Sequence, residues 1–283
     1  MSLASILRRA IGLAPAGPYY FFRRHSGAVR LAHWLNAFCL LFLLMSGLQI
    51  FNAHPALYWG ISSDFDHPIL SLTAQDSGHG LVGVTQIGPW RFDTTGVLGA
   101  SNEGGEPTAR GFPEWATLPG PQWLAMGRLW HFFFAWIFAI NGLLFWAYAL
   151  WSGHARRDLL PTKTDLAHLP QEIADHAQLK FPQGEAARRY NALQKLAYFF
   201  VIFGLGPLIV LTGLTMSPTM DSAFPQLLWI FGGRQSARTI HFICAFSFLG
   251  FFIVHIVMVV LSGTWNNLRS MITGSYAIEG KHE

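Results

Sequence analysis

Four long apolar stretches constrain this chain more than any other feature. They run over Leu31–Phe51, Leu129–Trp151, Leu196–Met216 and Ile240–Leu261, and none contains Asp, Glu, Lys or Arg. Each has the roughly 20 apolar residues that an α-helix needs to cross about 30 Å of hydrocarbon. Only 12% of the 283 residues are charged, about half the share usual in a soluble domain, and the mean hydropathy is +0.33. We therefore predict an all-α membrane protein, a bundle of four transmembrane helices.

Positive charge is divided unequally between the two sides of such a bundle. Fourteen Lys and Arg residues fall in the N-terminal tail, the connection between the second and third stretches and the C-terminal end, and five fall in the other two connections. Because Lys and Arg are retained on the cytoplasmic side, this predicts a bacterial inner-membrane protein with both termini in the cytoplasm. The expected organisation is a tail over 1–30, a four-span domain over 31–262 and a second tail over 263–283.

The connection between the first two stretches, about 52–122, is far longer than a hairpin needs. It is rich in Gly and Pro and carries seven acidic residues. Its aromatic residues include Trp90, Phe92, Phe112 and Trp115, which we expect to add to its surface. Connections of this length are usually functional. We expect it to lie outside the cell membrane as an ordered cap or docking surface. In the second outer connection, the apolar run Phe224–Phe231 predicts a short interfacial helix.

Four of the twelve histidines lie in the apolar stretches: His33, His131, His241 and His255. The others, such as His25, fall in loops or tails, where we expect them to be solvated. Ionisable groups inside a membrane span are costly and usually mark function. His241 and His255 are fourteen residues apart on one predicted helix, so they share a face with about 21 Å between them along the axis.

An antiparallel bundle pairs these histidines by depth, His33 with His255 near the inner face and His131 with His241 near the outer face. Two facing imidazoles supply both axial positions of a b-type haem, so the pattern predicts two haems. For any single histidine, a hydrogen bond across helices is the alternative. A separation of about 21 Å is too long for two ligands of one zinc ion. No serine elbow and no carboxylate accompanies the histidines in these stretches, as a hydrolytic triad would require.

Residues near the histidines fit the same interpretation. Arg30, Arg128 and Arg238 each precede a histidine by three residues, which places them where haem propionates would emerge, although each also suits a topology anchor. Gly47 and Gly142 return to a histidine's face at the level of the opposite haem. They could make room for a flat porphyrin ring or simply allow close helix packing.

The motifs that carry these residues resemble those of the bacterial membrane cytochrome b family. That family includes the b subunits of formate dehydrogenase-N, nickel–iron hydrogenase and, most similar, thiosulfate reductase. The shared segments are LAHW, LLMSGLQIF, NAHPALYWG, RLWHFFFAW, RYNALQK, LTGL and TIHF followed by His255. The resemblance covers all four stretches, but the long outer connection departs from the formate dehydrogenase pattern.

The resemblance implies haem-ligand roles for the four histidines and a quinone site at the cytoplasmic side that uses Asn191 and Gln194. From the residues alone, these two amides fit a helix cap or a solvated face equally well. The resemblance to thiosulfate-reductase-type b subunits implies that the partner is a molybdopterin oxidoreductase. Nucleic-acid binding is not expected, because the basic residues flank apolar stretches and form no single patch.

The sequence thus predicts a di-haem cytochrome that transfers electrons between membrane quinone and an external redox partner. One alternative is a stand-alone quinone oxidoreductase that acts on a small oxidant such as superoxide, which would favour a basic outer surface. Another is a membrane anchor or assembly subunit without haem.

Overall fold

The computed structural model describes residues 19–120, 122–180, 188 and 190–279. Within them, four helical segments are long and apolar enough to cross a membrane. They are α2 (Gly27–Phe51), α3 (Leu124–Trp151), Ala192–Thr215 and α9 (Arg234–Thr273). The four predicted spans are confirmed, and the chain is an integral membrane protein. Chain contacts divide it into two compact units, a first unit of 1–35, 141–206 and 246–283 and a second of 36–140 and 207–245.

The third span is an irregular helix. It consists of α5 (Ala192–Phe199), a π-helical segment (Phe200–Leu205) and α6 (Gly206–Thr215). Pro207 has no amide hydrogen and cannot donate to a carbonyl one turn earlier. A π-helical turn just before the proline absorbs this mismatch without ending the span.

Helix α9 continues well past the predicted end at Leu261. Gly263 has φ 121° and ψ 87°, a conformation that favours glycine and kinks the helix. Asn267 stabilises the kink by donating from Nδ2 to Ser262 Oγ (2.9 Å) and to the Gly263 carbonyl (3.0 Å). The amide therefore supplies hydrogen bonds where the regular helix pattern is interrupted.

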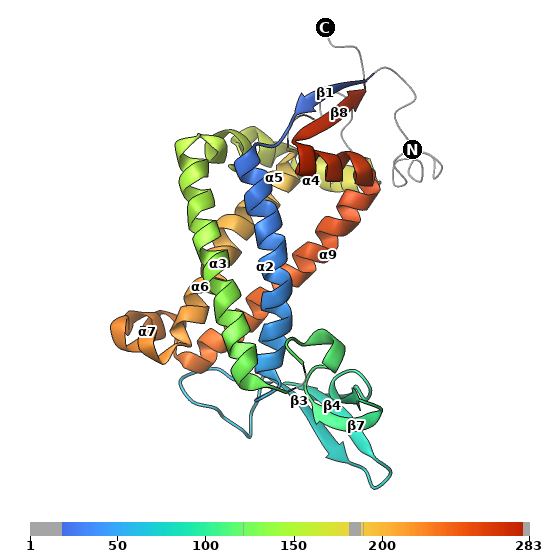
Figure 1. Cartoon of the computed structure of the whole chain (residues 1–283), viewed down its shortest axis with the longest axis vertical. Coiled ribbons are helices and arrows are strands. Elements are labelled where there is room, and N and C mark those ends of the chain that lie inside the picture. The colour runs from blue at the N-terminus through green and yellow to red at the C-terminus, as the bar shows by residue number, and fades with distance from the viewer. Residues whose placement is uncertain (1–18, 121, 181–187, 189, 280–283) are drawn as a thin grey trace. The chain divides into compact units, whose positions relative to one another are not determined.

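In the first unit, two strands that no predicted element covered pair with each other. β1 (Tyr19–Arg23) and β8 (Ser275–Glu279) are antiparallel neighbours (Figure 1). The Arg24 guanidinium lies 4.7 Å from the centre of the Tyr276 ring, a cation–π contact. The indole Nε1 of Trp34 also donates to the Met271 carbonyl at 3.0 Å. These contacts tie the start of α2 to the end of α9.

Also in the first unit, α4 (Lys163–Ala177) packs against α5. Thr162 caps α4, and its side chain and that of Asp165 form a reciprocal capping box. Lys195 reaches back from α5 to Asp165 with 2.9 Å between nitrogen and oxygen. The hydrogen bond from Lys195 is the main reason that the pKa of Asp165 falls to about 2.

The second unit contains the long connection, which is a small β-domain and not an open loop. Its strands in the described residues are β2 (Ala56–Leu57), β3 (Leu70–Asp76), β4 (Leu81–Ile87), β5 (Trp90–Asp93), β6 (Gly99–Glu103) and β7 (Glu106–Arg110). The first four form one antiparallel sheet in sequence order, and β6 pairs with β7. Figure 1 shows β3, β4 and β7 beyond the end of α2.

The expectation of an all-α fold is therefore incomplete. In LSLTAQD, apolar and polar residues alternate with the period of two that favours strands, and LVGVTQI is rich in β-branched residues, which strands also favour. Gly83 and Gly99 let β4 and β6 touch backbone to backbone, since a Cβ on either would overlap the other strand. Phe112, expected at the surface, is buried in the domain core with Phe51, Leu57 and Leu72.

Two short helices precede α9 in the second unit, α7 (Pro218–Ala223) and α8 (Gln226–Phe231). The predicted short helix over the apolar run is confirmed as α8. Trp229 on α8 is 85% exposed, which suits an aromatic side chain at the level of lipid headgroups.

Candidate functional site

The structure brings together both predicted histidine pairs. In the second unit, the ring centres of His131 on α3 and His241 on α9 are 6.1 Å apart, with an angle of 62° between the rings. In the first unit, the rings of His33 on α2 and His255 on α9 are 6.2 Å apart and inclined at 55°. Neither pair includes a carboxylate, so the site offers imidazoles alone.

These separations leave space for one metal ion between the rings. A metal–imidazole bond is about 2 Å long, as for zinc, and two such bonds in line bring the ring centres to about 6 Å. Direct hydrogen bonding between the imidazoles would need their nitrogens only about 3 Å apart in a suitable orientation. The near-identical spacing of both pairs therefore fits axial ligation of haem iron.

Hydrogen bonds fix the tautomer of His241. Its Nδ1 lies 2.9 Å from the Ile209 carbonyl oxygen, which can only accept, so Nδ1 carries the hydrogen. Nδ1 is also 3.2 Å from Thr212 Oγ1, whose own hydrogen is donated to the Leu208 carbonyl at 2.7 Å. Nε2 is left with a free lone pair, the form in which histidine binds a metal.

His131 has a matching arrangement. Its Nδ1 lies 3.0 Å from Ser46 Oγ, and the Ser46 hydroxyl donates to the Phe42 carbonyl at 2.6 Å. Because that hydroxyl already uses its hydrogen, Nδ1 of His131 is the donor and Nε2 is again the free nitrogen. Helix α2 therefore orients His131 as α6 orients His241.

A glycine follows each of these hydroxyl residues and lies against the imidazole. A Cβ added at Gly47 would be 3.3 Å from Cε1 of His131, and a Cβ at Gly213 would be 3.3 Å from Cε1 of His241. The missing side chain lets each imidazole approach the neighbouring helix closely enough for its Nδ1 bond. Gly47 thus makes room for the imidazole of His131, a role that neither porphyrin space nor close helix packing describes. At Gly142 a Cβ would meet nothing within 4 Å.

The His33–His255 pair has mainly aromatic neighbours. The Trp34 ring lies edge-on to His33 at 5.2 Å, and Phe251 stacks on His255 at 5.8 Å with 18° between the rings. Nδ1 of His33 is buried and has no hydrogen-bond partner in the described part of the chain. Packing, more than hydrogen bonding, orients these two rings.

Two of the three arginines predicted beside the haems already contact backbone carbonyls. Arg30 donates to the Ile272 carbonyl, and Arg238 donates to the carbonyls of Ala56 (2.7 Å) and His54. Arg128 is exposed, with its guanidinium 5.6 Å from the centre of the Phe132 ring. The pairing of these arginines with haem propionates remains a prediction. For Arg30 and Arg238, such pairing would compete with their hydrogen bonds to the backbone carbonyls.

Asn191 and Gln194 form a reciprocal capping box at the start of α5. Asn191 Oδ1 accepts from the Gln194 amide at 2.8 Å, and Gln194 Oε1 accepts from the Asn191 amide at 3.3 Å. Asn191 Nδ2 also lies 3.3 Å from His176 Nε2. The helix-cap alternative therefore describes what these amides do here, and a quinone role would be additional.

His25, expected to be solvated, is buried beside this cap. Its Nδ1 lies 3.3 Å from the Tyr190 hydroxyl, and the two rings stack at 6.2 Å. Burial, assisted by the nearby Arg24 charge, lowers the pKa of His25 to about 4, and burial raises the pKa of Tyr190. No local sequence pattern indicates this cluster, because it depends on residues 165 positions apart.

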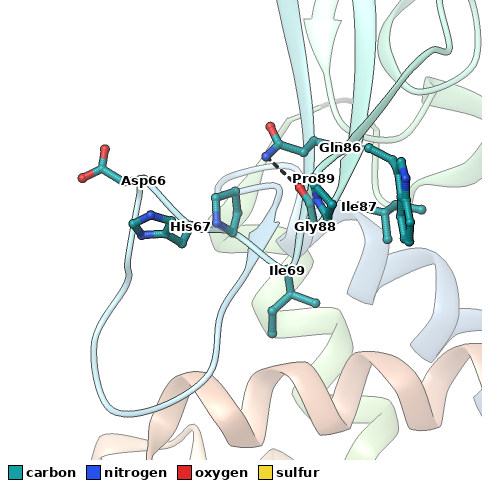
Figure 2. Close-up of a pocket in the computed structure, with 9 residues that line it drawn as sticks. Asp66, His67, Ile69, Gln86, Ile87, Gly88 and Pro89 are labelled. Atoms are coloured by element: carbon teal, nitrogen blue, oxygen red, sulfur yellow. Dashed lines mark hydrogen bonds between the residues drawn. The ribbon is translucent and has the colours of Figure 1, made fainter.

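A surface pocket of about 630 Å³ lies in the β-domain. Figure 2 shows it between the Asp66–Ile69 turn and the Gln86–Trp90 hairpin, with the Ile69 and Ile87 side chains along it. Its lining includes no residue of either histidine pair, so it is separate from the space between those imidazoles.

Four membrane helices with paired neutral imidazoles define a membrane protein suited to hold haem. A family model described as prokaryotic cytochrome b561 matches residues 24–274, and the chain belongs to that family. It is a membrane electron-transfer protein of the cytochrome b561 type, a family that binds haem b. One relative is a putative protein-methionine-sulfoxide reductase subunit, YedZ1, of Azospira oryzae. The two chains are 27% identical over 237 residues, which are 84% of this chain and 90% of the relative.

The contacts of Gly47 with His131 and of Gly213 with His241 lead to the same prediction for both glycines. Gly47→Ala and Gly213→Ala should each displace an imidazole, because the new Cβ at 3.3 Å is tighter than ordinary contact. We expect the haem-to-protein ratio to fall by up to one in each variant, measured by pyridine haemochrome assay. Gly250→Ala is the control, since Gly250 has open space around it and lies about two and a half turns from His241 along α9. Equal haem content in all three variants would contradict the proposed close approach.

Proposed function

We propose that this protein is a di-haem b-type cytochrome that transfers electrons between membrane quinone and an external redox partner, a molybdopterin oxidoreductase. The observation that carries the proposal is the geometry of the two histidine pairs at 6.1 and 6.2 Å. His131 and His241 each have Nδ1 committed as a donor, which leaves Nε2 for iron. The haem supplies reversible one-electron chemistry when bound, and the protein supplies ligands, orientation and an apolar surrounding.

The test of this proposal is haem stoichiometry. We expect two haems per purified chain, with the spectrum of paired imidazole ligands. His131→Ala or His241→Ala should lower the ratio towards one by removing the same haem, and His33→Ala or His255→Ala should remove the other. His67→Ala is a control, because His67 is exposed and bonds only to nearby Asp64. A ratio near one in the wild type would exclude a di-haem protein, and a ratio of zero would favour the anchor alternative.

The proposed orientation places both termini in the cytoplasm and the β-domain outside, and the distribution of Lys and Arg supports it. One exposed residue in each unit permits a direct test. Ser77→Cys, at the turn between β3 and β4, should react with an impermeant maleimide added to intact cells. Thr164→Cys, at the start of α4, should react only after permeabilisation. Native Cys39 and Cys244 are buried and should stay unlabelled. Ser101 in the β-domain is buried, so a cysteine at that position would not be a suitable labelling site. The reverse labelling pattern would invert the topology.

The β-domain is the proposed docking surface for the partner. The named relative is itself a reductase subunit, which supports a partner of the oxidoreductase class for this chain. Arg110 is buried and paired with Glu103 at 3.1 Å, so the domain's other six carboxylates dominate its surface charge. Trp90, Phe92 and Trp115 are exposed among them. An acidic surface with exposed aromatic rings favours a basic partner surface and repels superoxide, which disfavours the stand-alone alternative.

Neutralising part of this surface should slow electron exchange with the partner. We would combine Asp66→Asn, Glu106→Gln and Glu114→Gln, and avoid Asp76 and Asp93 because they hold turns. Haem oxidation by the purified partner should become at least about tenfold slower at low salt and lose most of its salt dependence. Quinol reduction of the haems should be unchanged. An unaltered salt dependence would place the docking surface elsewhere.

The proposed quinone role of Asn191 and Gln194 needs a test that separates it from helix capping. Asn191→Ala with Gln194→Ala removes both the amides and the cap. Asn191→Ser with Gln194→Glu removes the amides but keeps a capping box. If the amides bind quinone, both double variants should slow quinol-driven haem reduction by tenfold or more, as measured by stopped flow. Wild-type kinetics in the Ser and Glu variant would assign these residues to the cap alone.

A further inference from the structure

Gln49 is a buried polar side chain that nothing in the described structure satisfies. It lies on α2, is 0% exposed, and neither its Oε1 nor its Nε2 has a hydrogen-bond partner within the described residues. A primary amide can donate two hydrogen bonds and accept two. Leaving such a group unpaired in an apolar interior is destabilising, so buried amides are almost always bonded.

The surroundings of Gln49 place it beside the His131–His241 pair. It is one helical turn beyond Ser46, the residue that accepts from His131 Nδ1. A Cβ at Gly127 would lie 2.8 Å from Gln49 Cγ, so the glycine provides the space that the side chain fills. Gly127 precedes His131 by four residues and therefore lies on the same face of α3, one turn away. Both helices thus locate Gln49 one turn from the imidazole, all within the second unit.

The corresponding position on α6 lacks this unsatisfied group. Thr215 is three residues after Thr212, as Gln49 is three after Ser46, and it is also 0% exposed. Its hydroxyl donates to the Leu211 carbonyl of its own helix at 2.8 Å. Gln49 on α2 and Thr215 on α6 are thus equivalent positions beside the His131–His241 pair. Of these two, only Gln49 has polar atoms that still require a hydrogen-bond partner.

We propose that Gln49 is a positioning residue that donates a hydrogen bond from Nε2 to a propionate of the haem held by His131 and His241. This inference rests on the proposed haem ligation. The propionates are the only strongly polar groups on the rim of a b-type haem, and an amide hydrogen suits a carboxylate oxygen. Arg238, predicted for that role, already donates to two backbone carbonyls, and Arg128 is exposed.

Such a bond has an electrostatic consequence for the haem. A propionate carries negative charge near the iron and stabilises its oxidised, more positive state. A donor that partly neutralises this charge raises the reduction potential, and loss of the donor lowers it. Gln49→Leu should therefore shift one haem to a lower potential, and Gln49→Glu, which adds a carboxylate, should shift it further.

The experiment is a spectroelectrochemical titration of the full-length protein with both haems bound. We expect Gln49→Leu to lower the midpoint of the haem that disappears in His131→Ala, with the other midpoint unchanged as an internal reference. The propionate carboxylate band in redox-difference infrared spectra should shift in the same variant. Thr215→Val is the matched control and should leave both readouts at wild-type values. Gln49→Met, which is unbranched and similar in length, provides a second apolar variant if Gln49→Leu does not assemble.

The outcomes separate this inference from the function on which it rests. Two haems with unchanged midpoints and an unchanged carboxylate band in Gln49→Leu or Gln49→Met would overturn the Gln49 assignment and leave the di-haem proposal intact. Equal shifts of both midpoints would also overturn it, because a general loss of packing does not select one haem. A wild-type protein without a His131-dependent haem would instead overturn the proposed function.

Discussion

The hydrogen bond at each imidazole Nδ1 is the interaction on which the site in the second unit depends. In an apolar span, an unpaired imidazole nitrogen has no water to bond, and a charged imidazolium is strongly disfavoured. The Ile209 carbonyl and the hydroxyls of Ser46 and Thr212 remove this cost on one side of each ring. The same bonds hold the opposite nitrogen in its metal-binding form. Stability and ligand chemistry therefore have one physical origin here.

A hydroxyl residue followed by glycine provides the Nδ1 hydrogen bond at both histidines, as Ser46–Gly47 for His131 and Thr212–Gly213 for His241. The hydroxyl donates to its own helix and accepts from the histidine, and the next residue must lack a Cβ for the ring to come near. Gly47 and Gly213 stand at the same calculated distance, 3.3 Å, from their respective imidazoles. Larger residues at those positions would force the ring away from the hydroxyl and leave Nδ1 unsatisfied. Gly47 and Gly213 are therefore small because the imidazoles of His131 and His241 lie against them.

The spans and the histidine pairing could be predicted from the sequence because both follow from helix geometry alone. Charge-free length sets the spans, and a fourteen-residue interval keeps His241 and His255 on one face. The roles of Ser46 and Thr212 could not be read in the same way, since a hydroxyl in a helix usually bonds its own backbone. The burial of His25 and the bonds of Arg238 depend on segments distant in sequence. The β-domain is hard to predict because Gly and Pro are typical of loops, and of its two longest strands only LSLTAQD alternates clearly with period two.

The β-domain is tied to the helix that carries His241, and this bears on how a docking surface would communicate with a haem. Thr239 donates to the Tyr58 carbonyl at 2.7 Å, and Ser236 Oγ accepts from the Gly60 amide at 2.7 Å. At the end of α2, Asn52 bonds both backbone groups of Phe112, at 2.7 and 3.1 Å. These bonds are buried or partly buried, and they anchor the domain at two points within the second unit. These bonds restrict movement of the domain relative to the segment of α9 that carries His241. A partner bound to the domain would therefore keep a more constant distance from that histidine without touching the membrane helices.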